Sequence, residues 1–243
     1  SKFLYKKKYS IIGTYRTEDK TKKNLVKKYK IFKVNILNFN KIKKIIEKYK
    51  PDEIYNFAGL SDLKNSEKNI LYTDKINNFF VLKLINLLSR NKQIKFFQSL
   101  SSELFARKGV AIKTISEVKN LSPSNAYGIS KLSSYYYIDY LRKKYDLKIY
   151  CGFFFNHESI FRDQRFIVKQ LINHLINCSL NNAKIFEIRN ILSSKDFGAA
   201  KDYAEATWHI IQQNKKFDFI IGSGKIYNLL EIMKEISKVL KLK

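Results

Sequence analysis

Short runs rich in β-branched and aromatic residues alternate with longer amphipathic segments over residues 1–155. The short runs predict strands at residues 10–15, 30–36, 52–59, 94–100 and 148–155. The longer segments predict helices at residues 40–50, 73–91 and 127–146. Strands and helices that alternate in this way form a parallel sheet with helices on both faces. We therefore expect an α/β fold, a Rossmann-like doubly wound parallel sheet.

The pattern becomes less regular after residue 155. It predicts a helix, a strand and two further helices, at residues 166–180, 184–188, 201–213 and 227–240. We expect a core domain at residues 1–155 and a smaller, incomplete C-terminal lobe at residues 156–243, whose elements interleave with the end of the core.

The start of the chain departs from the usual dinucleotide-binding pattern. Such folds open with a strand, a glycine-rich turn and a helix, and N–H groups of the turn bind pyrophosphate. This chain opens with SKFLYKKKY, which reads as that helix, and continues directly to the second strand. In the strand order 3-2-1-4-5-6 the first strand is central. We expect this strand and the glycine-rich loop to be missing, which would leave a slot between two unpaired strand edges.

Positive charge dominates the composition. Lys and Arg number 47 against 21 Asp and Glu, which gives a formal net charge of +26. Such an excess raises the alternative of a nucleic-acid or acidic-membrane partner. The lysines are dispersed among Asn, Ile, Tyr and Phe, however, and form no nucleic-acid-binding motif. The pattern favours a solvated lysine surface, and neither nucleic acid nor membrane is an expected partner.

Two further features concern the cellular compartment. The sequence has no apolar run of about eighteen residues and no secretory signal at its start, which predicts a cytoplasmic protein. Cys151 and Cys178 are too few for a disulfide framework and wrongly spaced for a metal knuckle. Both are expected to be small buried side chains, and no metal site is expected.

Tyr127 and Lys131 form the most informative pair of residues. Residues four apart share a helix face, so the phenol and the ammonium can meet in one cleft. Lowering a tyrosine pKa by about three units takes roughly 4 kcal/mol. A positive charge about 4 Å away in a partly screened site supplies about that much, so Lys131 can make Tyr127 a usable base. In a chain so rich in Tyr and Lys, coincidence remains an alternative for this spacing taken alone.

A hydroxyl and a carboxylate follow the strand expected at residues 94–100. Ser101 and Glu103 stand where the carboxyl ends of parallel strands open onto the ligand crevice. Beside an activated tyrosine, they suit hydride transfer combined with proton abstraction. Without the tyrosine, the pair reads equally well as a helix cap and a solvated acid.

Four motifs occur in order along the chain: SSELF at 101–105, AYGISK at 126–131, FFNHES at 154–159 and KDFGAAKDYAEATWHIIQQ at 195–213. With these motifs the chain resembles the extended short-chain dehydrogenase/reductases and, within them, the GDP-mannose 4,6-dehydratases. The resemblance runs from about residue 1 to residue 235, and N-H-E-S and A-K-D-Y are its more specific parts. It implies an NADP-binding domain at residues 1–155 and a substrate-binding lobe at residues 156–243.

The resemblance implies a redox-neutral dehydration of GDP-mannose to GDP-4-dehydro-6-deoxy-D-mannose in nucleotide-sugar biosynthesis. By position, Ser101 replaces the family's usual threonine and polarises the sugar 4-OH. Tyr127 removes the 4-OH proton while hydride leaves C4 for NADP. Glu103 takes the C5 proton and assists loss of the 6-OH, after which hydride returns to C6. Lys131 also holds the nicotinamide ribose.

The resemblance further implies a set of contacts to NADP. A guanidinium matches phosphate geometry, so Arg16 after the second strand would meet the 2′-phosphate. The other implied cofactor contacts are Asn35, Ile36, Phe57, Ala58, Gly59, Leu60, Ser61, Tyr72, Lys131, His157 and Arg162. One more surface cation is the alternative for Arg16, and a satisfied core histidine is the alternative for His157.

The implied contacts to the nucleotide-sugar are Asn156, Glu158, Lys169 and Lys195, with solvated polar groups as the alternative. Some positions depart from the family pattern: Asn35 stands where an acidic residue is usual, and Lys195 replaces an arginine that would grip the diphosphate. These departures leave open a dehydratase or 4-epimerase of another nucleotide-sugar. Glu103 separates the two chemistries, because an epimerase needs no C5 base.

An alternative of another class is a catalytically inactive relic of the same fold, since a fold alone does not establish activity. The family resemblance implies a homodimer or homotetramer for a full-length protein. Without the glycine-rich loop, the chain by itself is expected to bind NADP weakly or not at all and to be inactive.

Overall fold

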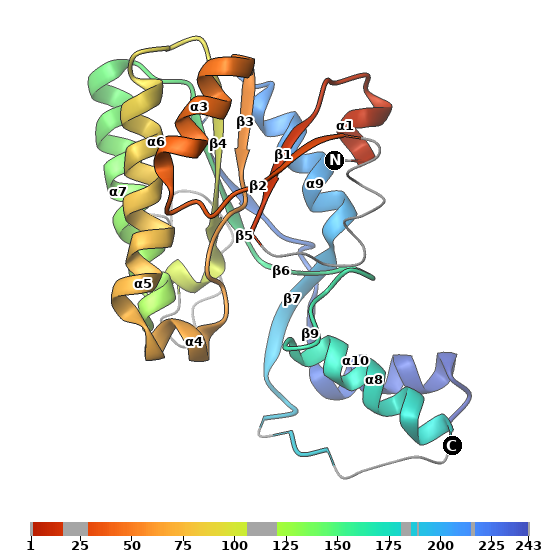
Figure 1. Ribbon diagram of the computed structural model, residues 1–243. Coiled ribbons are helices and arrows are strands. Elements are labelled where there is room, and N and C mark those ends of the chain that lie inside the picture. The colour runs from red at the N-terminus through yellow and green to blue at the C-terminus, as the bar shows by residue number, and fades with distance from the viewer. Residues whose placement is uncertain are drawn as a thin grey trace. The chain divides into compact units, whose positions relative to one another are not determined.

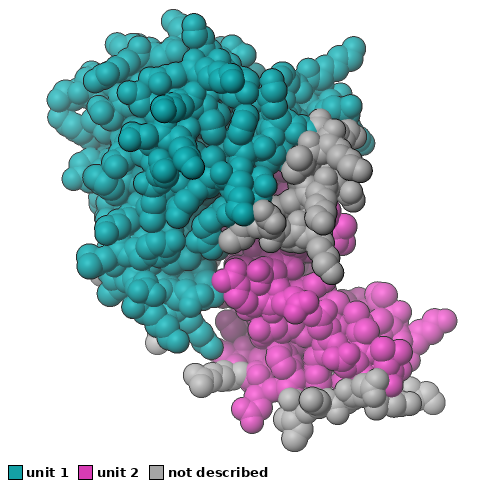
Figure 2. Space-filling view, viewed as in Figure 1, with its two compact units in different colours: residues 1–153, 207–219 teal, residues 154–206, 220–243 magenta. Residues whose placement is uncertain are grey.

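The computed structural model describes residues 2–16, 29–105, 121–180, 186–188, 190–214 and 217–242. The chain divides into two compact units, shown in Figure 2. Unit 1 comprises Ser1–Phe153 and Thr207–Phe219, and unit 2 comprises Phe154–Ala206 and Ile220–Lys243. Each unit is thus built from segments that are separated in the sequence. The roles assigned to residues 1–155 and 156–243 stay predictions.

Unit 1 contains a two-stranded sheet and most of a four-stranded sheet (Figure 1). The first pairs β1 and β2 in parallel, and these strands span Ile12–Tyr15 and Lys30–Lys33. The second has the order β3-β4-β5-β8, with strands that span Glu53–Asn56, Lys95–Ser101, Ile149–Phe154 and Asp218–Ile221. β3 and β4 pair in parallel. The arrangement confirms the expected α/β fold with a Rossmann-like parallel sheet. Among the described residues, no strand pairs with both β1 and β3.

The centre of unit 1 is apolar because β4 and β5 are buried on both faces. Phe96, Phe97 and Leu100 in β4, and Ile149 and Phe153 in β5, are each at most 2% exposed. Central strands of a parallel sheet need such continuous apolar runs, since helices cover both faces. The apolar core therefore holds β4 and β5 rigidly, and polar side chains at their carboxyl ends have a fixed backbone position.

Helices lie on two sides of the four-stranded sheet. One layer contains α3, α6 and α7, which span Phe39–Tyr49, Phe80–Leu88 and Ala126–Tyr145 (Figure 1). On the other side, Phe3 of α1 (Lys2–Lys6) packs with its ring centroid 5.9 Å from that of Trp208 in α9 (Ala200–Ile211). The alternating sequence pattern predicted this two-sided cover.

The single helix expected at residues 73–91 is wrong in detail. The segment contains α5 (Ile70–Asp74), a π-helical turn at Lys75–Phe79 and then α6, and α4 (Leu63–Lys68) precedes all three. Asn77 lies in the π turn and is fully buried. Its side chain bonds to groups outside the helix, and such tertiary bonds override a continuous local helical pattern.

Unit 2 contains a three-stranded sheet of order β6-β7-β9, whose strands span Asn156–Glu158, Ser194–Ala199 and Ile226–Asn228. β6 and β7 are parallel, whereas β7 and β9 are antiparallel. The helices α8 (Ile167–Ser179) and α10 (Leu229–Val239) pack against each other. Asn228 and Glu231 form a reciprocal capping box at the start of α10.

Two smaller expectations need correction. Residues 186–188, the described part of the strand expected at 184–188, adopt no regular secondary structure. Cys151 is buried as expected, but Cys178 is partly exposed and its Sγ lies 3.5 Å from His174 Nε2. Within the described parts of the chain, no helix is long and apolar enough to cross a bilayer. In the same residues, no group of three or more His, Cys, Asp or Glu side chains is arranged to hold a metal ion.

Candidate active site

Helix α7 begins at Ala126 because two side chains satisfy its first N–H groups. Asn125 Oδ1 accepts from Gly128 N at 2.8 Å, and Glu67 Oε1 accepts from Ala126 N at 2.7 Å. A capping side chain of this kind contributes about 1 kcal/mol to helix stability. Tyr127 and Lys131 follow one turn apart, and both belong to the buried face of the helix. The cap therefore fixes the start of the helix and, with it, the position of the candidate base Tyr127.

Lys131 is 3% exposed, and its Nζ donates to Ser99 O at 2.9 Å. Gln98 Nε2 donates to the same carbonyl at 2.9 Å. Burial disfavours the charged ammonium and lowers the pKa of Lys131 to about 8. The lysine is therefore still mainly protonated at neutral pH, and it can place a positive charge inside the site.

Ser101 and Glu103 are close to the start of α7. β4 ends at Ser101 and leads into a 3₁₀ turn at Ser102–Phe105. Ser101 Oγ accepts from Glu103 N at 3.2 Å, and Glu103 Oε2 accepts from Asn125 Nδ2 at 2.9 Å. The structure thus joins the end of β4 to the residue that caps the Tyr127 helix.

The turn at Phe57–Ser61 follows β3 and passes beside Lys131. Its backbone is held by Asn77, whose Oδ1 accepts from Leu60 N at 2.9 Å and whose Nδ2 donates to Leu60 O at 3.1 Å. A Cβ added to Gly59 would lie 3.1 Å from Asn77 Oδ1 and 3.3 Å from Lys131 Nζ. Glycine is therefore favoured there, and this candidate cofactor turn and Lys131 share one location. Phe57 in the same turn is exposed.

The other candidate cofactor residues of unit 1 lie near the ends of β1 and β2. Arg16 follows β1, and its Nη1 donates to the hydroxyl of Tyr72 in α5 at 3.4 Å. The structure therefore brings these two sequence-predicted residues together. Asn35 and Ile36 lie beyond β2, which ends at Lys33, and Asn35 Oδ1 accepts from Leu37 N at 3.0 Å.

In unit 2, His157 is part of an aromatic cluster. Its ring lies 4.9 Å from that of Tyr203 and 5.5 Å from that of Phe154. Its Nδ1 lies 2.9 Å from Phe155 O. Burial lowers the pKa of His157, which favours the neutral imidazole at pH 7. These contacts fit the core-histidine alternative and leave a cofactor contact untested.

The remaining unit 2 candidates differ in how they are held. Arg162 Nε lies 3.3 Å from Glu158 Oε2, and its guanidinium lies 3.5 Å from the centroid of the Phe166 ring. Burial raises the pKa of Glu158, and the nearby Arg162 opposes that shift. Asn156 O accepts from the Tyr203 hydroxyl at 3.3 Å. Lys169 lies at the start of α8, and Lys195 stands in β7 opposite Tyr227 of β9.

Residues 1–243 match the family described as GDP-mannose 4,6 dehydratase. The chain belongs to this family. The family match spans both units, and it includes each of the four sequence motifs.

Several curated relatives carry the same description as the family. The chain is 30% identical over 204 residues to GDP-mannose 4,6 dehydratase of Dictyostelium discoideum, which covers 81% of this chain and 57% of the relative. It is 30% identical over 195 residues to the Homo sapiens protein, which covers 79% and 52% respectively. The Vibrio cholerae protein is 29% identical over 210 residues, with 85% and 56% covered. The chain thus spans about half the length of these family members.

Several solved structures share the fold of this chain. UDP-glucose 4-epimerase of Thermotoga maritima superposes with a TM-score of 0.87 at 17% identity, covering 100% of this chain and 78% of that structure. dTDP-glucose 4,6-dehydratase of Bacillus anthracis, solved with NAD, gives a TM-score of 0.85 at 18% identity, with 99% and 76% covered. At these identities the likeness shows the fold alone.

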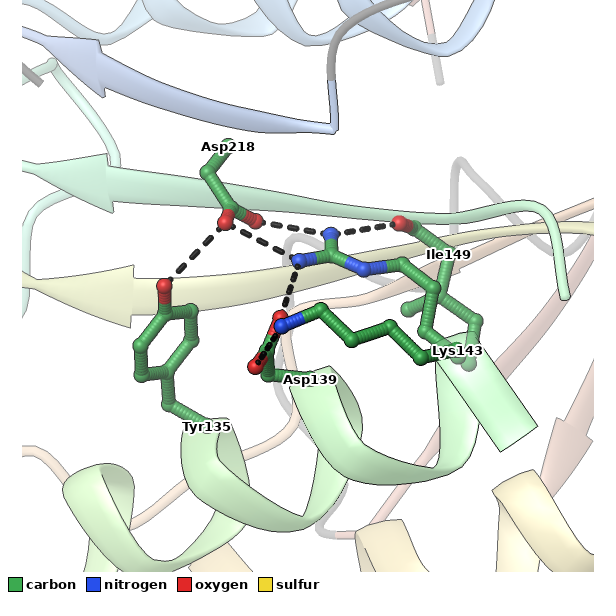
Figure 3. A network of polar contacts seen from close by, with 6 residues as sticks. Tyr135, Asp139, Lys143, Ile149 and Asp218 are labelled. Atoms are coloured by element: carbon green, nitrogen blue, oxygen red, sulfur yellow. Dashed lines mark hydrogen bonds and ion pairs between the residues drawn. The ribbon is translucent and has the colours of Figure 1, made fainter. Parts of the chain in front are cut away.

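Three residues whose hydrogen bonds hold this site in place were not identified from the sequence. Asn77 and Asn125 hold the Gly59 turn and Glu103, as described above. Arg142 anchors the far end of α7, because its guanidinium donates to Asp218 Oδ1 and Oδ2 at 2.8 and 3.0 Å and to Ile149 O at 3.1 Å (Figure 3). A helical-wheel reading places Arg142 on the same buried face as Lys131, which is the one signal that the sequence offered.

Proposed function

We propose that the full-length protein, meaning this chain with any residues that flank it in its gene, is a GDP-mannose 4,6-dehydratase. It would convert GDP-mannose to GDP-4-dehydro-6-deoxy-D-mannose and water without net redox change. The family match and the names of the relatives support this activity. The observation that carries the proposal is the position of Glu103, bonded at 2.9 Å to the residue that caps the Tyr127 helix. A C5 base there suits dehydration, and 4-epimerisation does not need one.

Each catalytic role is supported by a local feature. Tyr127 would take the 4-OH proton, and the buried ammonium of Lys131, one turn along the same helix face, would assist it. Ser101, at the carboxyl end of β4, would donate a hydrogen bond to the 4-oxygen. Glu103 would remove the C5 proton and, as the resulting acid, protonate the departing 6-OH. Because one carboxyl performs both proton transfers, it must stay within reach of both atoms. Once hydride has returned to C6, C5 would take a proton from solvent and Tyr127 would release the 4-OH proton, so that only water is lost.

The residues present fit a nicotinamide dinucleotide. The Gly59 turn passes beside Lys131, and a glycine there keeps the backbone close to the lysine ammonium. A bound nicotinamide would accept a hydride from the sugar and return it. We propose NADP in particular, because Arg16 directly follows β1 and offers a planar donor for a 2′-phosphate. Similar folds have been solved with NAD and with NADPH, in a Bacillus anthracis dehydratase and in RMD from Pseudomonas aeruginosa.

Residues of unit 2 are proposed to contact both the cofactor and the nucleotide-sugar. His157 and Arg162 are proposed to contact the cofactor. Asn156, Glu158, Lys169 and Lys195 are proposed to contact the nucleotide-sugar, in which the two lysine ammonium groups suit the diphosphate. The lysines lie on regular elements, α8 and β7, which hold their backbones in place.

We further propose that the full-length protein is a cytoplasmic homo-oligomer. Helix α7 exposes a stripe of large apolar side chains at about half of their surface, formed by Ile129, Tyr136, Tyr137 and Tyr140. Exposed apolar groups on one helix often mark protein–protein interfaces. A symmetric pair of α7 helices could bury the stripe.

A panel of nucleotide-sugars tests the proposed reaction. GDP-mannose, dTDP-glucose and UDP-glucose would each be incubated with the full-length protein and NADP, and the products identified by mass and NMR. The proposal predicts that GDP-mannose alone loses one water. Efficient dehydration of either glucose nucleotide would contradict the substrate, and a 4-epimer would contradict the reaction.

A further inference from the structure

Asn125 links the two halves of the candidate catalytic machinery. Its Oδ1 accepts from Gly128 N at 2.8 Å, inside the first turn of α7, and its Nδ2 donates to Glu103 Oε2 at 2.9 Å. The orientation of the amide is fixed chemically, because a backbone N–H can only donate and an ionised carboxylate can only accept. The amide oxygen of Asn125 therefore binds the helix, and its amide nitrogen binds the Glu103 carboxylate.

A second contact fixes the same junction. A Cβ added to Gly128 would lie 2.7 Å from Pro123 Cβ and 3.0 Å from Glu103 O. The backbone at Glu103 thus packs directly against the first turn of α7, without space for even one methyl group. This contact holds the main chain of Glu103, while Asn125 holds its carboxylate.

The geometry points to Asn125 as a positioning residue that aims the Glu103 carboxylate at the C5 proton of the substrate. This inference rests on the proposed function, since it gives Asn125 a role in one step of that reaction. A carboxylate side chain has several rotatable bonds, and a charge-assisted hydrogen bond restricts them. Because Asn125 also caps α7, the same amide sets Glu103 relative to Tyr127, two residues further along the chain.

The N-cap role and the positioning role can be separated by substitution. Ser caps helices about as well as Asn does, but its short side chain has no amide donor to reach Glu103. Asn125→Ser should therefore keep the helix and remove this one hydrogen bond to the carboxylate. Asn125→Asp keeps the cap and the shape but replaces the donor with a second carboxylate oxygen, which repels Glu103. Asn228→Ser at the capping box of α10 is the matched control, since it changes an Asn cap to Ser in unit 2.

The test measures steady-state turnover of GDP-mannose by the full-length wild type and these three variants, with C5-protio and C5-deuterio substrate. A displacement near 1 Å in a catalytic group can lower a rate by about 10²-fold, so we expect kcat of Asn125→Ser to fall about 10- to 100-fold. KM should stay within about twofold, because binding is not altered. The C5 isotope effect should be at least as large as in the wild type, because C5 proton removal becomes slower. Asn125→Asp should lose more activity, and Asn228→Ser should match the wild type.

The remaining outcomes each overturn the inference. Wild-type kcat in both Asn125 variants would show that the amide does not position Glu103. A lower kcat with a smaller C5 isotope effect would mean that another step was slowed, and an equal loss in Asn228→Ser would mean that any cap substitution acts alike. If the wild type leaves GDP-mannose unchanged, the proposed function fails and the role of Asn125 fails with it. If Asn125→Ser does not fold, the comparison of Asn125→Asp with the wild type decides.

Discussion

The candidate catalytic residues of unit 1 and the candidate binding residues of unit 2 are held in different ways. Lys131 donates a hydrogen bond to a carbonyl of β4, and Glu103 accepts one from the residue that caps α7. Both side chains are therefore held by elements that belong to the buried sheet or pack on it. Arg162 instead pairs with Glu158 and stacks on Phe166, in the loop between β6 and α8. Regular elements place groups more accurately than loops do. We therefore expect substitutions of Lys131 and Glu103 to act on kcat and substitution of Arg162 to act on affinity.

The largest expected effect is that of Tyr127→Phe. The change deletes one hydroxyl from a large buried aromatic ring, so the fold should persist while the base is lost. We expect kcat to fall by roughly 10⁴, the upper end for a positioned proton-transfer group. Tyr5→Phe on α1 is the control and should retain full activity. A Tyr127→Phe enzyme with more than a tenth of wild-type kcat would remove Tyr127 from the mechanism.

Glu103→Gln should give the next largest loss. The amide cannot take the C5 proton, and we expect kcat to fall by roughly 10² to 10³. Substrate affinity, measured by calorimetry with GDP-mannose, should change little, since unit 2 is proposed to supply most of the binding contacts. An intact kcat would contradict the role of Glu103 as the base. A large loss of affinity for GDP-mannose would show that Glu103 also contributes to substrate binding, against the proposed division between the two units.

Lys131→Met should lower activity while raising stability. Burial lowers the pKa of Lys131 to about 8, so below pH 8 the folded protein holds a costly charge. That cost decreases as pH rises from about 8 toward the 10.5 of an exposed lysine. After allowing for the lost bond to Ser99 O, we expect the free energy of unfolding at pH 7 to rise by about 1–3 kcal/mol. Chemical denaturation should show a smaller gain at pH 10, and destabilisation at pH 7 would contradict the account.

Arg162→Ala should give the smallest effect on the reaction and the clearest contrast with unit 1. Losing one charge-assisted contact should weaken NADP binding about tenfold, which corresponds to about 1.4 kcal/mol. At saturating NADP, kcat should remain near the wild-type value. A large loss of kcat at saturation would place Arg162 among the groups that act on the reaction itself.

The elements with strong periodic patterns were predictable from the sequence. The continuous apolar runs of β4 and β5 and the long helix at 127–146 match the structure to within about two residues, as is usual for element ends. The break at Lys75–Phe79 was not predictable, because the local pattern stays helical and the break depends on bonds from Asn77 to Leu60 and Ser130. The strands β6 and β9 contain only three residues each, too few to show a period.

The candidate site was predictable as residue types and not as contacts. Tyr127 and Lys131 were found from their four-residue spacing, and Glu103 from its place after a strand. The link through Asn125 joins residues 22 positions apart and depends on how β4 meets α7. No local pattern encodes such a contact, so the supports of the site emerge only from the packed structure.

The most direct test of the central claim is the conversion of GDP-mannose by the full-length protein with NADP in D₂O, followed by NMR of the product. If Glu103 removes the C5 proton and Tyr127 starts the reaction, the product will have lost one water, will carry deuterium at C5, and will form without net reduction of NADP. Unchanged GDP-mannose, or a 4-epimer that still carries its original C5 proton, would contradict the account.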